Sequence, residues 1–488
     1  MNKYYNNDDG IIQKQELFSL PFICTFLLCL VGLYFAFYKP FVGLDAMGHQ
    51  VMGTIIGALA FWMFKPGGIP FAVGTVVLLV GCVMSGLSIS QVAAGFSGSS
   101  LWLLIPALFF GFALKKSGLG NRIAFFLLKS INPSYIGILL VWLVLGTGFS
   151  LLTPSIGIRF LILTAISMSV ADACNLSKDS RGRSLIIITA WASAIFPGTG
   201  WYTGSLYGPV LTGFLPIEMQ RIATEGLWFK VMGLPWIFIT IAFFVIIYFM
   251  LRPEEKLHIT QEKFAALYLE LGNITKSEKI VFITLMTVLL CLPFQAMLGL
   301  ASFQIMLLGF LIFLLTRVIG KQDIGTGISW DIILFFGIIM GLPDIIITSG
   351  IASWAEPVMG YVITFLTRSA LTFLIGLTLI FFALRFIDVT WGFAIGAFLA
   401  TATPVLYNSY HIHPTIVMMI FTFGGTLFFT SYQQPWIPQA ESIMQDAGWN
   451  PKHLRQAACV YAGVVILTLI IFLPYWNAIG VMSLWING

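Results

Sequence analysis

Charged residues are scarce in this sequence. They make up 9% of the 488 residues, against about 25% in an average soluble domain. Apolar residues make up 58% of the chain, a fraction that a soluble fold cannot bury but that a lipid bilayer accommodates. The composition therefore excludes a soluble enzyme, a disordered chain and a nucleic-acid-binding protein, and it predicts an integral membrane protein with no nucleic-acid partner.

Other patterns are missing as well. The apolar runs do not alternate with polar residues as the strands of a membrane barrel do, so we expect helices. The six cysteines form no Cys-x-x-Cys pair, and we therefore expect neither disulfides nor a metal site. The first residues include Asp8, Asp9 and Glu16 in place of the basic and then apolar order of a cleavable signal, so we expect no such signal.

Long apolar runs recur from residues 21–38 to residues 457–473. A crossing needs about 20 helical residues, and several runs are clearly longer or shorter than that. The main polar interruption is residues 252–279, where acidic and basic residues mix as on an amphipathic surface helix. We predict an all-α polytopic membrane protein of about 11 transmembrane helices plus two re-entrant hairpins, with an N-terminal half (1–251), a connector (252–279) and a C-terminal half (280–488).

The two halves share an order of motifs. Each contains a tryptophan, a Leu-Phe-Phe-Gly sequence and a Ser-Gly pair. These are Trp102, 108–111 and 117–118 in the first half, and Trp330, 334–337 and 349–350 in the second. Weak internal similarity of this kind is typical of inverted-repeat secondary transporters, whose binding sites lie near the middle of the membrane where the two repeats meet.

The first half has a broken apolar run, and the region near 134–173 is too long for one helix. Basic residues flank it on both sides, which predicts that the chain enters and leaves on the cytoplasmic side as a hairpin with its tip near Ser155. Two spans remain the other interpretation. A helix that begins after Pro154 would offer N–H groups and the charge of Arg159 to an anion. Alternatively, the region is a Pro-kinked helix whose Arg159 pairs with a carboxylate or reaches an interface.

The second half repeats this pattern near 369–410. Ala394-Ile395-Gly396 corresponds there to Ser155-Ile156-Gly157. Arg385 and Asp388 lie three residues apart, so they could form an ion pair with each other. Residues 188–205 and 421–436 then follow the two broken runs and end in glycine, proline and hydroxyl residues, which would unwind a helix and free its carbonyl groups.

The motif order resembles that of the divalent anion:sodium symporter family, in particular its branch of citrate/succinate exchangers and plastid dicarboxylate translocators. KKSGLGNRIAFFLLK (115–129) resembles the signature of that branch, and TPSIGIR (153–159) aligns with its PSNTxR motif. Residues 330–354 are similar to the segment that opens the second repeat. The family's Ser-Asn-Thr tips, which help to hold Na⁺ and substrate carboxylates, are Ser155-Ile156-Gly157 and Ala394-Ile395-Gly396 here. Isoleucine supplies no side-chain oxygen ligand, so these tips argue against coupling to Na⁺. They favour exchange, coupling to protons, or a different substrate.

The resemblance implies a secondary transporter of small organic anions, namely di- or tricarboxylates, which works by exchange or ion-coupled symport with an elevator-type motion. It also implies a homodimer, a bacterial inner membrane, and no cofactor beyond Na⁺ or H⁺ as a coupling ion. The expected substrate-binding residues are Ser155, Gly157, Arg159, Thr199, Gly396, Thr426, Ser431 and Gln433. The expected ion-coupling residues are Thr153, Gly198, Asp388 and Thr401.

Two alternatives stay open. The first is a transporter of inorganic oxoanions, similar to sulfate or arsenite, on the same fold. The second is an intramembrane enzyme, which would need acids or histidines at one depth. His411 and His413 diverge on a helix, and Asp172, Asp331, Asp344 and Asp388 have no metal-binding spacing, so we do not expect an enzyme. Gln433 and Gln434 are either amide donors to the substrate or exposed loop residues at a helix end.

Overall fold

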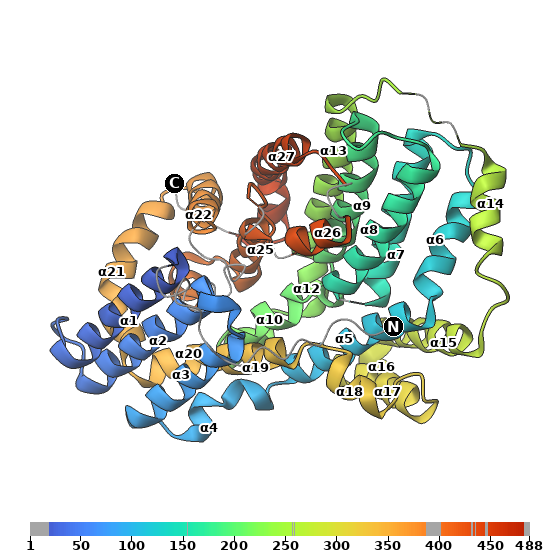
Figure 1. Cartoon of the computed structure of the whole chain (residues 1–488). Coiled ribbons are helices and arrows are strands. Elements are labelled where there is room, and N and C mark those ends of the chain that lie inside the picture. Colours follow the sequence, from blue (N-terminus) through green and yellow to red (C-terminus); the bar gives the residue numbers. More distant parts are fainter. Residues whose placement is uncertain are drawn as a thin grey trace. The chain divides into compact units, whose positions relative to one another are not determined.

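The computed structural model describes residues 19–153, 155–255, 257, 259–386, 402–430, 433–434, 436–444 and 448–482. Within these ranges the chain is helical apart from turns and one isolated bridge between Ile412 and Met482 (Figure 1). Nine of the described helices are long and apolar enough to cross a membrane. The predicted class of all-α multi-pass membrane protein is therefore confirmed, while the number of crossings and the re-entrant hairpins stay predictions.

The chain packs as two compact units. Unit 1 comprises residues 1–96 and 331–357, and unit 2 comprises residues 97–330 and 358–488. This division differs from the expected halves because residues 331–357 pack with the N-terminal helices and not with the chain that follows them. The two units are defined by packing, whereas the expected halves are defined by repeated motifs. The boundaries predicted for the halves and the connector therefore stay predictions.

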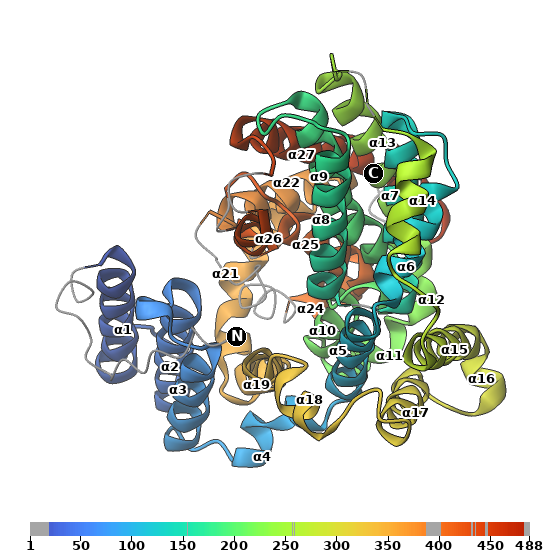
Figure 2. The same ribbon diagram turned by 45° about the vertical axis from the view of Figure 1, so that its right-hand side comes forward.

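Unit 1 contains α1 (Leu20–Tyr38), α2 (Ala46–Phe64), α3 (Phe71–Met84), α4 (Ile89–Val92), α19 (Trp330–Ile339), α20 (Leu342–Thr348) and the first part of α21 (Ile351–Leu366). Figure 2 shows α1, α2 and α3 side by side. Gly32 lies so close to α2 that a Cβ there would be 2.6 Å from the carbonyl of Gly53. Asp331 accepts hydrogen bonds from the N–H groups of Phe71 (2.9 Å) and Ala72 (2.7 Å), so α19 caps the start of α3.

Unit 2 contains the longer series of helices. These include α5 (Ser99–Ser117), α6 (Leu119–Lys129), α7 (Tyr135–Leu152), α8 (Ile156–Ala173), α9 (Arg181–Thr199), α10 (Tyr207–Gly213), α12 (Glu225–Trp228), α13 (Leu234–Met250), α14 (Gln261–Leu269), α15 (Lys276–Cys291), α17 (Ser302–Leu315), α18 (Lys321–Thr326), α22 (Ala370–Leu384), α24 (Thr403–Tyr410), α25 (Pro414–Gly425), α26 (Trp436–Met444) and α27 (Pro451–Ala478). Every residue of α9 after Arg181 is buried. Since a helix that is covered on all sides lies at the centre of its packing neighbours, α9 is the core of unit 2, and α7, α8, α13 and α27 all contact it.

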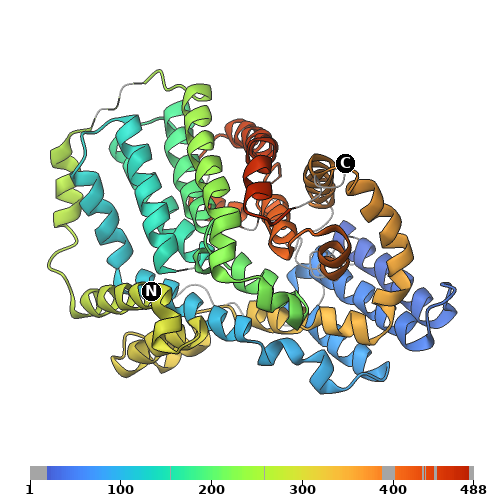
Figure 3. The same ribbon diagram turned by 180° about the vertical axis from the view of Figure 1, so that it is seen from behind.

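Helices α6 to α9 stand side by side in the views from the front and from behind (Figures 1 and 3). Gly182 on α9 contacts Tyr135 at the start of α7, and Gly146 faces Ser193 further along, so α7 and α9 run in the same direction. Side chains of α14 bind the carbonyls of Lys129, at the end of α6, and Ala173, at the end of α8. The chain between residues 134 and 173 therefore returns to the end from which it left. Both arms have 18 residues, about 27 Å, so their lengths fit two spans as well as a hairpin.

The two repeats share backbone geometry at matched positions. Gly118, before α6, and Gly350, before α21, both adopt the left-handed conformation, with φ of 80° and 75°. Ser134 and Ser369 have nearly identical backbone angles and cap α7 and α22 in the same way, each by accepting from an N–H three residues later. These correspondences lie within the individual segments and agree with the predicted internal repeat.

A buried ion pair anchors the connector. Arg122 on α6 donates from Nε to Oε1 of Glu278 (2.6 Å), and its two terminal nitrogens bind the carbonyls of Leu271, Gly272 and Asn273. Both charged side chains are almost fully buried, with exposed fractions of 8% and 4%. The segment between α14 and α15 is thereby tied to α6, and α14 itself packs against α6 (Figure 2).

We expect Arg122→Gln to lower the free energy of unfolding by about 3 kcal/mol, because it leaves a buried carboxylate without its partner. The matched control is Arg181→Gln, which breaks an ion pair with Glu254 whose side chains are 54% and 83% exposed. That pair contributes less than about 1 kcal/mol. Unfolding of the purified full-length protein in detergent measures both, and equal stability of the two variants would contradict the prediction.

Candidate functional site

The break between α7 and α8 is held by a short series of hydrogen bonds. Thr153 is extended, with φ of −157°, and its hydroxyl donates to the carbonyl of Ala107 (3.1 Å) and accepts from the N–H of Ser155 (3.1 Å). Ser155 then caps α8 by accepting from the N–H of Ile158 (3.4 Å). Both hydroxyl side chains are buried. Their oxygens therefore stabilise the break itself.

Arg159 lies in the first turn of α8 and is 0% exposed. Its Nε donates to the carbonyl of Ala194 on α9 (2.8 Å). Its Nη1 donates to the carbonyl of Gly204 (2.7 Å) and also to that of Thr153. The guanidinium thus folds back along α8 toward the break, and Nη2 has no hydrogen-bond partner among the described residues.

Arg159 takes part in none of the ion pairs between described residues. These pairs are Lys116–Asp323, Arg122–Glu278, Arg181–Glu254 and Arg183–Asp172. The suggested pairing of Arg159 with a carboxylate is therefore not seen in the described part of the chain. Since the start of a helix carries partial positive charge, the guanidinium and the first turn of α8 together make this end of α8 electropositive.

Two of the predicted residues lie at the end of α9 next to this guanidinium. A Cβ at Gly198 would lie 2.6 Å from Nη2 of Arg159. A side chain at this position would therefore clash with the guanidinium. The hydroxyl of Thr199 donates to the carbonyl of Ile195 one turn earlier (3.1 Å), and is therefore used within its own helix. The carbonyl of Thr199 accepts from Nε1 of Trp228 (3.2 Å).

Three polar side chains near this end of α9, those of Ser150, Trp201 and Ser205, are not among the predicted site residues. Trp201 donates from Nε1 to the hydroxyl of Ser150 (3.0 Å). Ser205 follows Gly204 directly, is fully buried, and its hydroxyl has no partner among the described residues. A serine near the end of a buried helix has no sequence signal of its own, because serine is equally common as a simple packing residue.

The residues of the first turn of α8 differ in burial. Ile156 is 2% exposed, whereas Gly157 and Ile158 are only half-buried. A Cβ at Gly157 would lie 3.0 Å from the six-membered ring of Trp436 on α26, and the same indole contacts Phe160 (centroids 5.4 Å apart). The N–H groups of Ile156 and Gly157 are unpartnered among the described residues, as expected for the first turn of a helix.

Two of the site residues predicted in the second half, Thr426 and Gln433, are buried, and so is the neighbouring Gln434. Gln433 is 0% exposed and Gln434 is 2% exposed, so the interpretation of both as exposed loop residues is wrong. Gln433 accepts through Oε1 from the N–H of Thr430 (3.0 Å), and its carbonyl accepts from Arg385. Its Nε2 has no partner in the described ranges. The hydroxyl of Thr426 donates to the carbonyl of Thr422 (2.8 Å).

The other predicted site residues lie outside the described residues. These are Asp388, Gly396, Thr401 and Ser431. The whole set of site residues stays a prediction. The described residues contain no group of three side chains suited to a metal ion.

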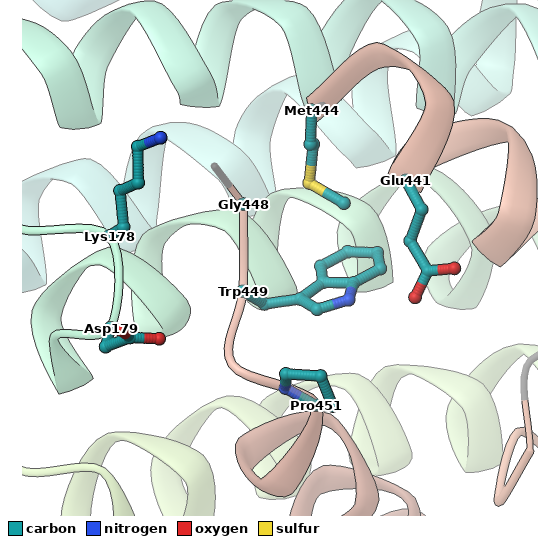
Figure 4. Close-up of a pocket in the computed structure, with 7 residues that line it drawn as sticks. All are labelled: Lys178, Asp179, Glu441, Met444, Gly448, Trp449 and Pro451. Atoms are coloured by element: carbon teal, nitrogen blue, oxygen red, sulfur yellow. The ribbon is translucent and has the colours of Figure 1, made fainter. Parts of the chain in front are cut away.

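A pocket of about 410 Å³ lies far from these residues, where α9 and α27 begin. Figure 4 shows Lys178, Asp179, Glu441 and Trp449 around it. Ala194, which binds Arg159, is 13 residues along α9 from Arg181, or about 20 Å. None of the predicted site residues lines this pocket.

Comparison with known proteins identifies relatives of the chain. Residues 22–482 match the family described as "Sodium:sulfate symporter transmembrane region". The chain is 25% identical to Dicarboxylate transporter 2.1, chloroplastic, of Arabidopsis thaliana over 60% of its own length. The match spans 53% of that protein, about half its length. It is 24% identical to Inner membrane protein YbhI of Escherichia coli, over 71% of this chain and 74% of that one.

A solved structure has a similar fold. It is the crystal structure of the Alcanivorax borkumensis YdaH transporter, with a TM-score of 0.51 and 14% identity over 80% of this chain and 88% of that chain. At that identity the likeness concerns the fold alone. The match to the family covers nearly the whole sequence, and the relatives named above are membrane proteins and transporters rather than enzymes. The chain therefore belongs to the sodium:sulfate symporter family, the divalent anion:sodium symporter family that its motifs resemble.

Proposed function

We propose that this protein is a secondary transporter of small organic anions, specifically di- or tricarboxylates. The observation that carries the proposal is the burial of Arg159 among backbone carbonyls, without a carboxylate partner in the described chain. Burying an unbalanced charge is costly in a membrane protein, so such residues tend to serve a function. A bound anion would balance the guanidinium and the start of α8 at the same time.

The arrangement at the break supports exchange or proton coupling over coupling to Na⁺. The carbonyl of Thr153 already accepts from Arg159, and Gly198 packs against the same guanidinium. A sodium ion needs several oxygen ligands, and at these two residues it would lie beside a permanent positive charge. Ile156 supplies no oxygen where the family has an asparagine.

Three further parts of the proposal follow from family membership. We propose that transport proceeds by an elevator-type motion and that the protein is a homodimer. We also propose that it resides in a bacterial inner membrane, which is supported by the similarity to the Escherichia coli protein named above. The name of the Arabidopsis relative supports dicarboxylates as the cargo.

Transport of an inorganic oxoanion is the second candidate, because the family description names sulfate. Both cargoes carry negative charge and would be stabilised by the same guanidinium. They differ in length and in apolar area, so competition separates them.

In proteoliposomes loaded with unlabelled succinate or malate, we expect labelled succinate to enter by counterflow. Excess external dicarboxylate should suppress this uptake, while sulfate at equal concentration leaves it nearly unchanged. Empty liposomes are the control. In sulfate-loaded proteoliposomes, counterflow of labelled sulfate that excess succinate does not suppress would favour the second candidate. Absence of counterflow for both labelled succinate and labelled sulfate would refute the transport of these anions.

We expect Arg159→Gln to raise the KM for the transported anion about 10- to 100-fold, the effect of losing a charge-assisted hydrogen bond. Arg159→Lys keeps the charge but not the planar donor set, so its KM should rise less. Arg122→Gln is the matched control, because it removes a buried arginine far along the chain from the break. If Arg159→Gln and Arg122→Gln lower stability alike and leave KM unchanged, Arg159 has only a structural role.

Replacing Na⁺ by choline should leave the initial rate of succinate counterflow unchanged, because the carbonyl of Thr153 is engaged by Arg159 and the hydroxyls of Thr153 and Ser155 are engaged by backbone groups. The same proteoliposomes measure this at constant ionic strength and constant pH. Uptake that requires Na⁺ would show that a sodium site exists elsewhere in the chain.

A further inference from the structure

The pocket of about 410 Å³ has no part in the proposed function. It is formed within unit 2 by the segment between α8 and α9, the end of α26 and the start of α27. Both α8 and α27 are long and apolar enough to cross a membrane, so the pocket lies at the ends of two such helices. The ends of membrane-spanning helices lie at the depth where lipid headgroups meet water.

Hydrogen bonds and ring contacts hold the wall of the pocket between α9 and α27. The hydroxyl of Ser184 accepts from the N–H of Asn450 (3.0 Å) and lies 2.9 Å from Nδ1 of His453. The indole of Trp449 is 6% exposed and packs edge-to-face against Trp191, with centroids 6.1 Å apart. This wall is therefore formed before a ligand binds, which lowers the cost of ordering it.

Charged side chains of both signs line the pocket around this indole. They are Lys178, Asp179 and Glu441, and all three are exposed. None of them takes part in an ion pair between described residues. In the view of Figure 4, Lys178 and Asp179 lie on one side of Trp449 and Glu441 lies on the other. The pocket therefore offers separate places to a negative group and to a positive group.

The balance of these charges indicates the class of ligand. A simple anion would be attracted by Lys178 but repelled by two carboxylates, and a simple cation would be repelled by Lys178. A molecule with both charges avoids these repulsions when its acidic group lies at Lys178 and its ammonium group at Glu441. Asp179 directly precedes Ser180, the N-cap of α9, so the start of that helix balances part of its charge. An ammonium group over the face of the indole would gain further attraction.

We propose that this pocket binds a zwitterion that carries an ammonium group and an acidic group, either phosphate or carboxylate. Two sources share this chemistry. One is the headgroup of an ethanolamine phospholipid, which a membrane supplies at the depth of the pocket. The other is a free zwitterion from the aqueous phase. The site is separate from the break before α8, so the proposal does not depend on the identity of the transported anion.

The test is isothermal titration calorimetry of the purified full-length protein in detergent with glycerophosphoethanolamine, a soluble zwitterion. We expect saturable binding that is at least about fivefold tighter than that of glycerol 3-phosphate or ethanolamine, each of which carries one of the two charges. Absence of glycerophosphoethanolamine binding up to about 10 mM would overturn the proposal. Equally tight binding of either single-charge compound would also overturn it, because only one of the two charges would then be recognised.

Two exposed residues of the pocket provide the variants. Lys178→Gln and Glu441→Gln should each weaken the binding of glycerophosphoethanolamine about fivefold, and neither removes a buried group. The matched controls are Lys279→Gln and Glu218→Gln, which remove an exposed charge of the same sign outside the pocket and should leave the affinity unchanged. Equal affinity of the pocket variants and the controls would place the bound zwitterion elsewhere and overturn the proposal.

Reconstitution of the full-length protein in nanodiscs distinguishes the two sources. In discs of phosphatidylglycerol alone, we expect added glycerophosphoethanolamine to bind as it does in detergent. If membrane headgroups fill the pocket, discs that contain phosphatidylethanolamine should abolish this binding. If only free zwitterions fit, the affinity should be the same in both kinds of disc. Both results support a zwitterion site and identify its occupant, whereas loss of binding in both kinds of disc would overturn the proposal.

Discussion

A permanently charged guanidinium that is buried among carbonyl groups constrains the structure around it. Arg159 connects three pieces of backbone that are separate in the sequence: the break before α8, the middle of α9 and the turn at Gly204. Carbonyl oxygens satisfy hydrogen-bond donors but carry only partial charge. The contacts can therefore fix the geometry of the break without neutralising the site. A carboxylate in their place would have given a self-contained ion pair with no need of a ligand.

The surrounding helices are adapted to this arrangement. α9 is buried along almost all of its length, which gives the guanidinium a fixed wall, and Gly198 provides the space beside Nη2. Ile156 is buried. It aligns with the asparagine of the family's Ser-Asn-Thr motif, so a buried apolar side chain stands where that motif has an amide. The break thus combines a rigid frame with two half-buried residues, Gly157 and Ile158.

The amino-acid sequence predicts the class of fold well, because apolar runs and small residues have direct physical consequences in a membrane. The paired Ser-Gly motifs predict an internal repeat, and Gly118 and Gly350 share the left-handed conformation. The partners of Arg159 carry no such signal, since Ala194 and Gly204 bind it through main-chain oxygens that any residue possesses. The burial of Gln433 and the contact of Trp436 with Gly157 likewise depend on long-range packing. The packing of residues 331–357 with the N-terminal helices was equally invisible in the sequence.

The anchoring of the connector by Arg122 has a consequence for how the chain can move. A linker that joins two repeats usually acts as a hinge, because its backbone is free to change its dihedral angles. Here the carbonyls of Leu271, Gly272 and Asn273 are all engaged by one guanidinium on α6. Residues 271–273 are therefore fixed to α6, and we expect a displacement of α15 to move α6 with it.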